Sequence, residues 1–152
     1  MTEVQFRPLF VVSFQTSPQV VGEVPLGYFR RAGIISGGQF EGERLSGTVL
    51  PGGGDWLMRR ADGVIHLDVR AMLQTDAGDT FFMTYTGRLK MPPDSEARLA
   101  AGEQIGEDEV YFRTAIQFEA AAEPILWLND IVAFSIGKRE PSGPTYRVFE
   151  ML

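Results

Sequence analysis

Two charged residues that could do chemistry lie two positions apart in one strand-like run. Asp68 and Arg70, with His66 beside them, alternate with apolar residues between positions 64 and 73. Residues two apart on a β-strand share a face, so the charged residues form one side and the apolar residues the other. The apolar side needs a core, and the charged side needs either water or a polar cavity. We predict that the charged side faces an enclosed polar lumen.

These charged groups would have clear chemical uses in a lumen. A carboxylate such as Asp68, or Asp55 after the glycines at 52–54, can carry a proton to and from a substrate. A guanidinium such as Arg70 can anchor a carboxylate or stabilise an enolate-like oxyanion. The simpler alternative for Asp68 and Arg70 is an exposed ion pair, which contributes little to stability. His66 lies near the hairpin end of its strand, which favours a surface position.

Further polar and aromatic residues lie in strands where apolar residues are expected. Arg113 follows Tyr111 and Phe112 and needs a carboxylate, water or a ligand as partner, and Asn129 raises the same question. Tyr85 could donate a proton, although a barrel tyrosine often only packs. The two tryptophans are candidates for the core or for an apolar pocket wall. The candidate catalytic residues are Asp55, Asp68 and Tyr85, and the candidate substrate-binding residues are Arg70, Arg113, Asn129, Trp56 and Trp127.

Several familiar classes of site are excluded by composition and spacing. The chain has one histidine and no cysteine, so neither a common zinc site nor a Cys-His nucleophile can be assembled. No serine lies in a G-x-S-x-G context. The glycines at 52–54 precede Asp-Trp rather than Lys-Ser or Lys-Thr, so they do not form a phosphate loop. Residues 76–79 leave a carboxylate-only Mg²⁺ or Ca²⁺ site open but fit a turn better. We predict no metal and no cofactor.

The elements that position these residues are short strands joined by turns. Asp-Gly at 62–63 and the segment 76–79 are typical of hairpins. Residues between 91 and 108 favour one short helix of about two turns. Because a long exposed sheet edge invites aggregation, we predict an all-β fold, a closed, mostly antiparallel β-barrel of about eight to ten strands. The expected strands cover residues 6–15, 27–36, 42–50, 55–60, 64–75, 80–89, 111–119, 126–137 and 145–151.

Length and charge limit the class of protein. A chain of 152 residues with 44% hydrophobic residues suits a single domain over 1–152. The net charge of −6 disfavours nucleic acid as a partner. No run approaches the about 20 apolar residues of a membrane span, and the N-terminus lacks the pattern of a signal peptide. We expect a cytoplasmic protein without a membrane partner, and a homodimer is the candidate assembly because small barrels often associate.

Five ordered motifs resemble those of the family called domain of unknown function 3237. The resemblance covers nearly the whole chain and implies a compact, mostly antiparallel β-barrel found in many bacterial and fungal proteins, without a general activity. The recurring polar positions of that family correspond here to residues already singled out, namely Asp55, Asp68, Arg70, Arg113 and Asn129. The motifs are Gly37-Gly38-Gln39-Phe40-Glu41-Gly42, Leu50-Pro51-Gly52-Gly53-Gly54-Asp55-Trp56, Leu67-Asp68-Val69-Arg70, Tyr111-Phe112-Arg113-Thr114 and Trp127-Leu128-Asn129.

The favoured function is that of a small-molecule pocket protein acting as a cofactor-independent isomerase, cyclase or lyase. Its substrate would be a small carbonyl- or carboxylate-bearing organic compound with some aromatic character. Arg70 or Arg113 would hold the anionic group, and Asp68 or Asp55 would move the proton. The first alternative is a non-catalytic barrel that binds a hydrophobic acid through the same arginine. The second is an interaction scaffold with no ligand, in which the polar residues only neutralise one another.

Overall fold

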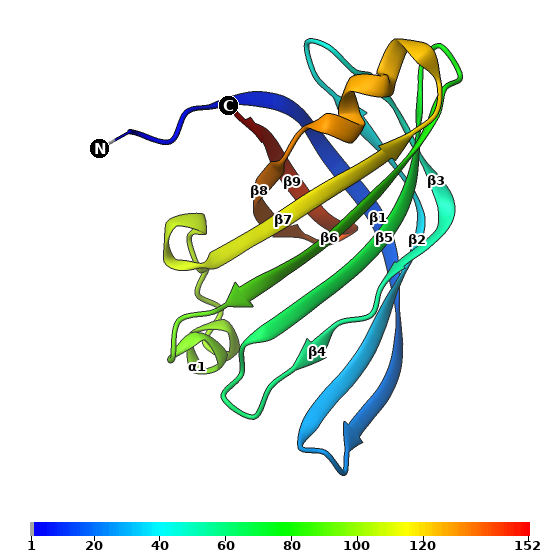
Figure 1. Ribbon diagram of the computed structural model, residues 1–152. Helices are drawn as coiled ribbons and strands as arrows, with labels where there is room; N and C mark the ends of the chain where they lie inside the picture. The colour runs from blue at the N-terminus through cyan, green and yellow to red at the C-terminus, as the bar shows by residue number, and fades with distance from the viewer. Residues whose placement is uncertain (1) are drawn as a thin grey trace.

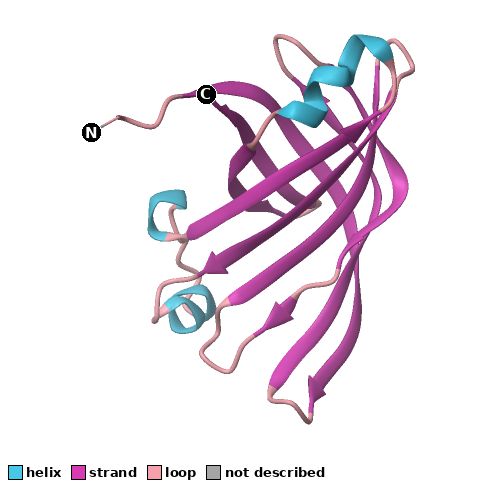
Figure 2. Cartoon of the chain, in the orientation of Figure 1, coloured by secondary structure: helices cyan, strands magenta, loops and turns pink. Residues whose placement is uncertain are grey.

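Nine strands, one α-helix and two 3-10 helices organise residues 2–152, the part of the chain described by the computed structural model (Figures 1 and 2). The strands are β1 (Phe6–Val24), β2 (Tyr28–Glu41), β3 (Ser46–Asp55), β4 (Met58–Arg59), β5 (Ile65–Thr75), β6 (Thr80–Lys90), β7 (Tyr111–Ala120), β8 (Ala133–Glu140) and β9 (Gly143–Met151). The helices are α1 (Ser95–Ala100), η1 (Glu107–Glu109) and η2 (Glu123–Asp130).

The strands form a single antiparallel sheet that closes into a ring. Their order is β1, β9, β8, β7, β6, β5, β3 and β2, and β1 also pairs with β2. The first part of β1 pairs with β9 and the longer remainder with β2, so the same strand joins both ends of the sheet. The two-residue β4 fills the space between β2 and β5 beyond the end of β3. The predicted closed antiparallel barrel with one short helix is confirmed.

Alternation along each strand separates the interior from the surface. In β5 the buried residues are Leu67, Val69, Ala71 and Leu73, and the side chains between them point outward. β6 and β7 follow the same period of two. Because successive strand residues point to opposite sides, each strand gives one row of side chains to the interior of the ring. The apolar rows predicted from the sequence therefore do form the core.

Several predicted strand boundaries were wrong, and two of the differences involve a proline. β1 does not end at Pro18 but continues to Val24, with Pro18 opposite Gly33 in the pairing with β2. Register shifts on both sides of this stretch let the hairpin continue past a residue that has no amide hydrogen to donate. The start of the predicted strand at 126–137 is the 3-10 helix η2, which has Pro124 in its first turn. That position suits proline because the first helical amides need no partner within the helix.

The interior of the ring has a packed part and a hollow part. Phe10 lies close to the rings of Phe40, Phe81 and Phe118, with ring centroids 5.3 to 6.5 Å apart, and this cluster fills the packed part. A second aromatic cluster is centred on Tyr146 and lies beside the hollow part. The two clusters differ in polarity because the first consists of phenylalanines and the second includes two phenols. The hollow part therefore has polar groups in its wall.

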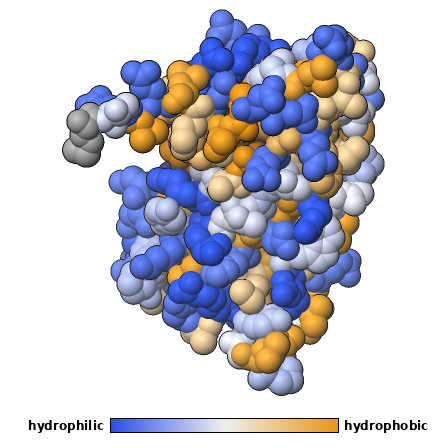
Figure 3. All heavy atoms as spheres, viewed as in Figure 1, coloured by the Kyte–Doolittle hydropathy of each residue, from blue (hydrophilic) through white to orange (hydrophobic). Residues whose placement is uncertain are grey.

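Apolar side chains also reach the surface. The end of the β1–β2 hairpin extends beyond the barrel, where Val20, Val21 and Leu26 are exposed (Figure 1). In the space-filling view, apolar atoms gather at this lower end and near the N-terminal segment (Figure 3). None of the helices in residues 2–152 is long and apolar enough to cross a membrane.

Replacement of Gly137 on β8 tests how the wall of the hollow part is packed. A Cβ atom at Gly137 would lie 2.7 Å from the ring of Phe112 on the neighbouring β7. We expect Gly137→Ala to displace that ring and to lower the free energy of unfolding by about 1–3 kcal/mol. Urea denaturation followed by near-ultraviolet circular dichroism measures this change. Gly33→Ala is the control, because the nearest atom to its new Cβ would be 3.9 Å away. Equal losses in both variants would contradict the packing argument.

Candidate functional site

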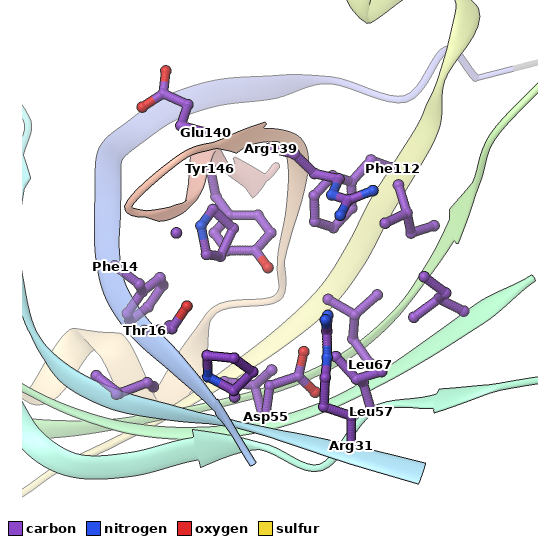
Figure 4. A pocket seen from close by; sticks show the side chains of 18 of the residues that line it. Phe14, Thr16, Arg31, Asp55, Leu57, Leu67, Phe112, Arg139, Glu140 and Tyr146 are labelled. Atoms are coloured by element: carbon purple, nitrogen blue, oxygen red, sulfur yellow. The ribbon is translucent and has the colours of Figure 1, made fainter. Parts of the chain in front are cut away.

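A cavity of about 240 Å³ lies inside the barrel, in the hollow part of its interior (Figure 4). β1, β2 and β3 form one side, β5, β6 and β7 another, and the turn between β8 and β9 borders the opening. Phe14, Leu67 and Phe112 contribute apolar wall. The cavity reaches the surface at the exposed β8–β9 turn. The polar side chains that line it are Thr16, Arg31, Asp55, Tyr85, Arg139, Glu140 and Tyr146.

Asp55 enters the cavity from the last position of β3. It lies opposite the inward-facing Val69 of β5 and opposite Gly33 of β2. Residues paired directly across a sheet share a face, so the partner Val69 sets the inward direction of Asp55. One carboxylate oxygen, Oδ1, accepts a hydrogen bond from the backbone N–H of Asp68 at 3.0 Å. In residues 2–152 this is the hydrogen bond that fixes the orientation of the carboxyl group, while the cavity lies beside it.

The proton affinity of Asp55 is unusual for a carboxyl group. Burial, with a smaller contribution from the charge of Asp68, raises its pKa to about 6. The Asp68 amide and the positive charge of Arg31 act in the opposite direction but do not cancel the effect of burial. A carboxyl group removed from water is easier to protonate because its charged form loses hydration. Asp55 can therefore change its protonation state close to neutral pH.

Glu150 provides a contrast within the same interior. Its side chain is also buried, but it accepts a hydrogen bond from Nε of Arg7 at 2.8 Å and contacts the guanidinium of Arg44. Arg7 holds the pKa of Glu150 below its usual value. A buried carboxylate paired with two arginines stays ionised, which suits a structural ion pair rather than proton transfer. Glu150 has two arginine partners and is a structural carboxylate. Asp55 lacks such partners within residues 2–152 and is suited to chemistry.

Arg31 extends from β2 along the cavity wall beside Asp55 (Figure 4). Its Nε atom is buried and has no hydrogen-bond partner among residues 2–152. A buried donor without a partner is costly, by about 1–3 kcal/mol, and native structures retain few of them. The sequence places Arg30 and Arg31 side by side, so on a strand one of the two must point inward. That signal could have identified Arg31 as a site residue.

Two phenols complete the polar lining of the cavity. Tyr85 on β6 and Tyr146 on β9 are buried, and their ring centroids are 5.2 Å apart. Burial raises the pKa of both hydroxyl groups well above the usual value. Both therefore stay protonated over the physiological pH range and remain hydrogen-bond donors. Tyr85 was among the predicted site residues. Tyr146 was missed, because the alternation in 145–151 marks it only as an inward-facing residue.

The prediction that the charged side of β5 faces the lumen is wrong. The side chains of Asp68 and Arg70 are 51% and 53% exposed, and they form an ion pair at 3.3 Å on the outer surface. His66 also points outward, where burial and the charges of Arg88 and Arg60 lower its pKa. The physical reason lies in the other row of β5. Burying its Leu and Val side chains in the core is favourable, whereas burying the charged row would cost free energy.

The remaining predicted substrate-binding residues also lie outside the cavity. Arg113 donates to the backbone oxygen of Phe112 at 3.0 Å and stacks on Tyr111. Trp127 packs under the guanidinium of Arg44, 4.5 Å from it. Trp56 is 40% exposed and lies near Arg70. Each side chain finds a partner on the outside or at the end of the barrel, so only Asp55 and Tyr85 of the predicted set line the cavity.

Asn129 has a structural environment at the end of η2. Its side chain accepts from the N–H of Ala120 at 3.0 Å and donates to the carbonyl oxygens of Ala120 and Leu126. These bonds join η2 to the end of β7. No group of three or more histidine, cysteine, aspartate or glutamate side chains in residues 2–152 is arranged to hold a metal ion.

Replacement of Asn129 tests this structural environment. Asn129→Ala removes three hydrogen bonds near the surface, where water can replace part of them, so we expect the free energy of unfolding to fall by about 1 kcal/mol. Asn129→Asp keeps the acceptor for the Ala120 amide but places a carboxylate oxygen against the carbonyl oxygens of Ala120 and Leu126, so it should lose at least as much. Chemical denaturation measures both changes. If Asn129→Ala leaves stability unchanged but weakens ligand binding, the residue belongs to the binding site after all.

Asp55→Asn tests the burial of the carboxyl group. Because the fold raises the pKa of Asp55, the folded state favours the protonated form. The stabilisation of the folded state by this protonation is complete below pH 3.8 and is lost as the pH rises through about 6. The neutral asparagine avoids this loss, so we expect the variant to be about 1–3 kcal/mol more stable than the wild type at pH 7.5. The difference should vanish near pH 3.5.

Urea denaturation at both pH values measures the effect of Asp55→Asn. Asp130→Asn is the control, because Asp130 is exposed and does not line the cavity. The control should change stability little at either pH. A stability difference for Asp55→Asn that is the same at both pH values would show that the carboxyl group is not protonated by burial.

Comparison with known proteins places this architecture in a known group. Residues 4–151 match the profile of the family described as "Protein of unknown function (DUF3237)". A UPF0311 protein from Rhodopseudomonas palustris (strain TIE-1) is 34% identical over 107 residues, which is 70% of this chain and 69% of that protein.

Solved structures share the whole fold. A crystal structure of a beta-barrel like protein from Acinetobacter baumannii AYE is 28% identical, with a TM-score of 0.86, and the match covers 100% of this chain and 98% of that one. A structure described as an enzyme from Penicillium herquei is 19% identical with a TM-score of 0.75, covering 100% and 97% of the two chains. At that identity, the second likeness shows the fold alone. On the match over nearly its entire length, the chain belongs to the DUF3237 family, whose members are described as proteins of unknown function.

Proposed function

We propose that the protein is a cofactor-independent enzyme that moves a proton on a small carbonyl-bearing molecule inside the barrel, as an isomerase, cyclase or lyase. The observation that carries the proposal is Asp55, a carboxyl group in the cavity wall with a pKa raised to about 6. General acid–base catalysis is most efficient when the pKa of the catalytic group lies near the working pH. Perturbed carboxyl groups in cavities are therefore candidates for such a role.

The arrangement supports a proton-transfer step in which all atoms are accounted for. The Asp55 carboxylate takes a proton from the carbon next to a substrate carbonyl. The electron pair of that C–H bond forms the C=C bond of an enolate, and the π electrons of the carbonyl group move to its oxygen. The hydroxyl groups of Tyr85 and Tyr146 donate to the enolate oxygen, which bears the new charge. Asp55 then returns the proton to another atom of the same intermediate. No oxidant or reductant enters the step, and as written it gives isomerisation. In ring closure the enolate carbon would instead attack an electrophilic carbon of the same molecule, and in elimination it would expel a leaving group that takes the proton from Asp55.

The environment of Asp55 favours this use over a purely structural one. The carboxylate keeps its orientation through the Asp68 amide, and Phe14, Leu67 and Phe112 give the cavity an apolar wall from which a bound substrate would displace water. Removal of water strengthens the interaction of an enolate with nearby donors. The Penicillium herquei protein, which is described as an enzyme, has the same fold and therefore agrees with a catalytic use of this barrel.

A non-catalytic binding barrel is the second candidate. It is favoured by the buried Nε of Arg31, since a guanidinium without a partner is suited to hold an acid whether or not a reaction follows. The two candidates differ in what they require of Asp55. Catalysis requires a carboxyl group there, whereas binding of an acid does not.

Hydrogen–deuterium exchange on an enolisable probe tests the proposed catalysis. Phenylpyruvate is incubated with the protein in D₂O, and proton NMR follows loss of the signal from the carbon next to the keto group. We expect Asp55→Asn to slow the protein-catalysed exchange by about 10²- to 10⁴-fold, which is the usual contribution of a general base. The wild-type rate should rise with pH through about 6 and then level off, because the carboxylate is the active form.

The control for this assay is Asp130→Asn, which should keep the wild-type rate. Circular dichroism checks that every variant is folded. Tyr146→Phe should reduce the rate less than Asp55→Asn, because Tyr85 remains as a donor. An Asp55→Asn variant that exchanges at the wild-type rate would refute the catalytic proposal and favour the binding barrel.

A further inference from the structure

Two arginines from different parts of the chain border the same cavity. Arg31 comes from β2, and Arg139 comes from the end of β8, next to the β8–β9 turn. In the close-up view both side chains reach into the cavity, Arg31 from one wall and Arg139 from the facing wall (Figure 4). Arg139 has the strand parity of the buried Gly137, so it continues the inward row of β8 to the opening. Arg139 was not singled out from the sequence.

Neither guanidinium has a direct side-chain partner within the described chain, although the positive charge of Arg31 acts on the nearby Asp55. No side-chain hydrogen bond or ion pair joins Arg31 or Arg139 to another residue between 2 and 152. Glu140, which lines the same opening, instead lies 3.7 Å from the Lys138 amine and accepts from the Thr145 hydroxyl at 3.2 Å. Its carboxyl group points away from the centre of the cavity (Figure 4). The acidic residue nearest to the opening is therefore occupied elsewhere.

The unpaired arginines stand out against the charge of the whole protein. The chain has 20 acidic and 14 basic residues, so it has more than enough carboxylates to pair with every arginine and lysine. Because Glu140 is paired with Lys138, the other charged lining residues leave one positive charge in the cavity when Asp55 is ionised. A partly buried cation favours an anionic partner, and guanidinium and carboxylate groups match in geometry. The cavity is therefore complementary in charge to a monoanion.

The rest of the cavity indicates the body of that monoanion. The rings of Phe14, Phe112 and Tyr146 surround it, and a flat ring packs favourably against aromatic walls. The cavity volume of about 240 Å³ lies just below the range of about 300–1,000 Å³ that is usual for ligand pockets. This space suits a compound with a single substituted ring rather than a larger polycyclic molecule.

We propose that the cavity selects monoanionic aromatic acids, whose ring packs among Phe14, Phe112 and Tyr146 and whose carboxylate is held by Arg31 and Arg139. The proposal rests on the site of the proposed function and names its substrate class. Arg139 is the specificity-determining residue, because it lies at the opening, where the acid group of a ligand would remain after the ring has entered. Arg31 holds the same group from the inner wall, beside Asp55.

Binding measurements with matched acids and amides test this proposal. Benzoate, phenylacetate and cinnamate are compared with their neutral amides by isothermal titration calorimetry at pH 7.5. We expect the acids to bind about tenfold to a hundredfold more tightly than the amides, as charge-assisted hydrogen bonds would provide. Arg139→Gln should remove most of this preference and leave the amide affinity nearly unchanged. Arg147→Gln should keep the preference, because Arg147 points outward from β9.

The results also separate this proposal from the proposed catalysis. Asp55→Asn should bind the acids at least as tightly as the wild type, since it removes a negative charge near the ligand. Equal affinity for acids and amides, unchanged acid binding in Arg139→Gln, or no detectable binding of any of the acids would overturn the ligand class. If the acids bind as expected but Asp55→Asn retains deuterium exchange, the catalytic role fails while the ligand class stands.

Discussion

The interior of this protein exists because β1 pairs on both of its edges. Its first residues bind β9 and its later residues bind β2, and Val11 to Ser13 have partners on both sides. Without this double pairing, β2 and β9 would present open edges and the sheet would have two exposed faces. Closure gives every strand one inward row, and that row decides which side chains fill the core and which can line a cavity.

The inward rows do not fill the barrel evenly, and this unevenness makes a site available. Phenylalanines pack one part tightly, whereas the part near the β8–β9 turn keeps free volume beside Tyr85 and Tyr146. Asp55 reaches this space from the end of β3, after a stretch where the pairing of β3 with β5 is irregular. Irregular pairing at a strand end is a common way to direct a polar side chain. The free energy cost of burying its charge is then offset by the stability of the whole barrel.

The arginines around the cavity and those elsewhere perform different tasks. Arg7 and Arg44 neutralise Glu150, and Arg70 pairs with Asp68 on the outer surface. In each of these ion pairs, an arginine neutralises a carboxylate that the strands place next to it. The cavity arginines form no such ion pair within residues 2–152, which is why we propose them as the groups that hold an acid.

Local patterns determined much of this protein. Alternation and turn residues were sufficient to predict a closed antiparallel barrel with one short helix. Of the candidate site residues, the structure brings Asp55 and Tyr85 to the cavity wall. The same alternation could not show which row of β5 faces inward. Two rows of equal period can be exchanged without changing the pattern, and we assigned Asp68 and Arg70 to the wrong side. Only the burial of Leu67 and its neighbours in a common core settles that choice.

The sequence alone therefore determined the type of element and the period of each strand, because these depend on neighbouring residues. The tertiary structure decided the composition of the cavity. Arg31, Arg139 and Tyr146 meet Asp55 only through pairing between strands that are far apart in the chain. Such pairing depends on ring closure, and no local spacing encodes which distant side chains will then share one enclosed space.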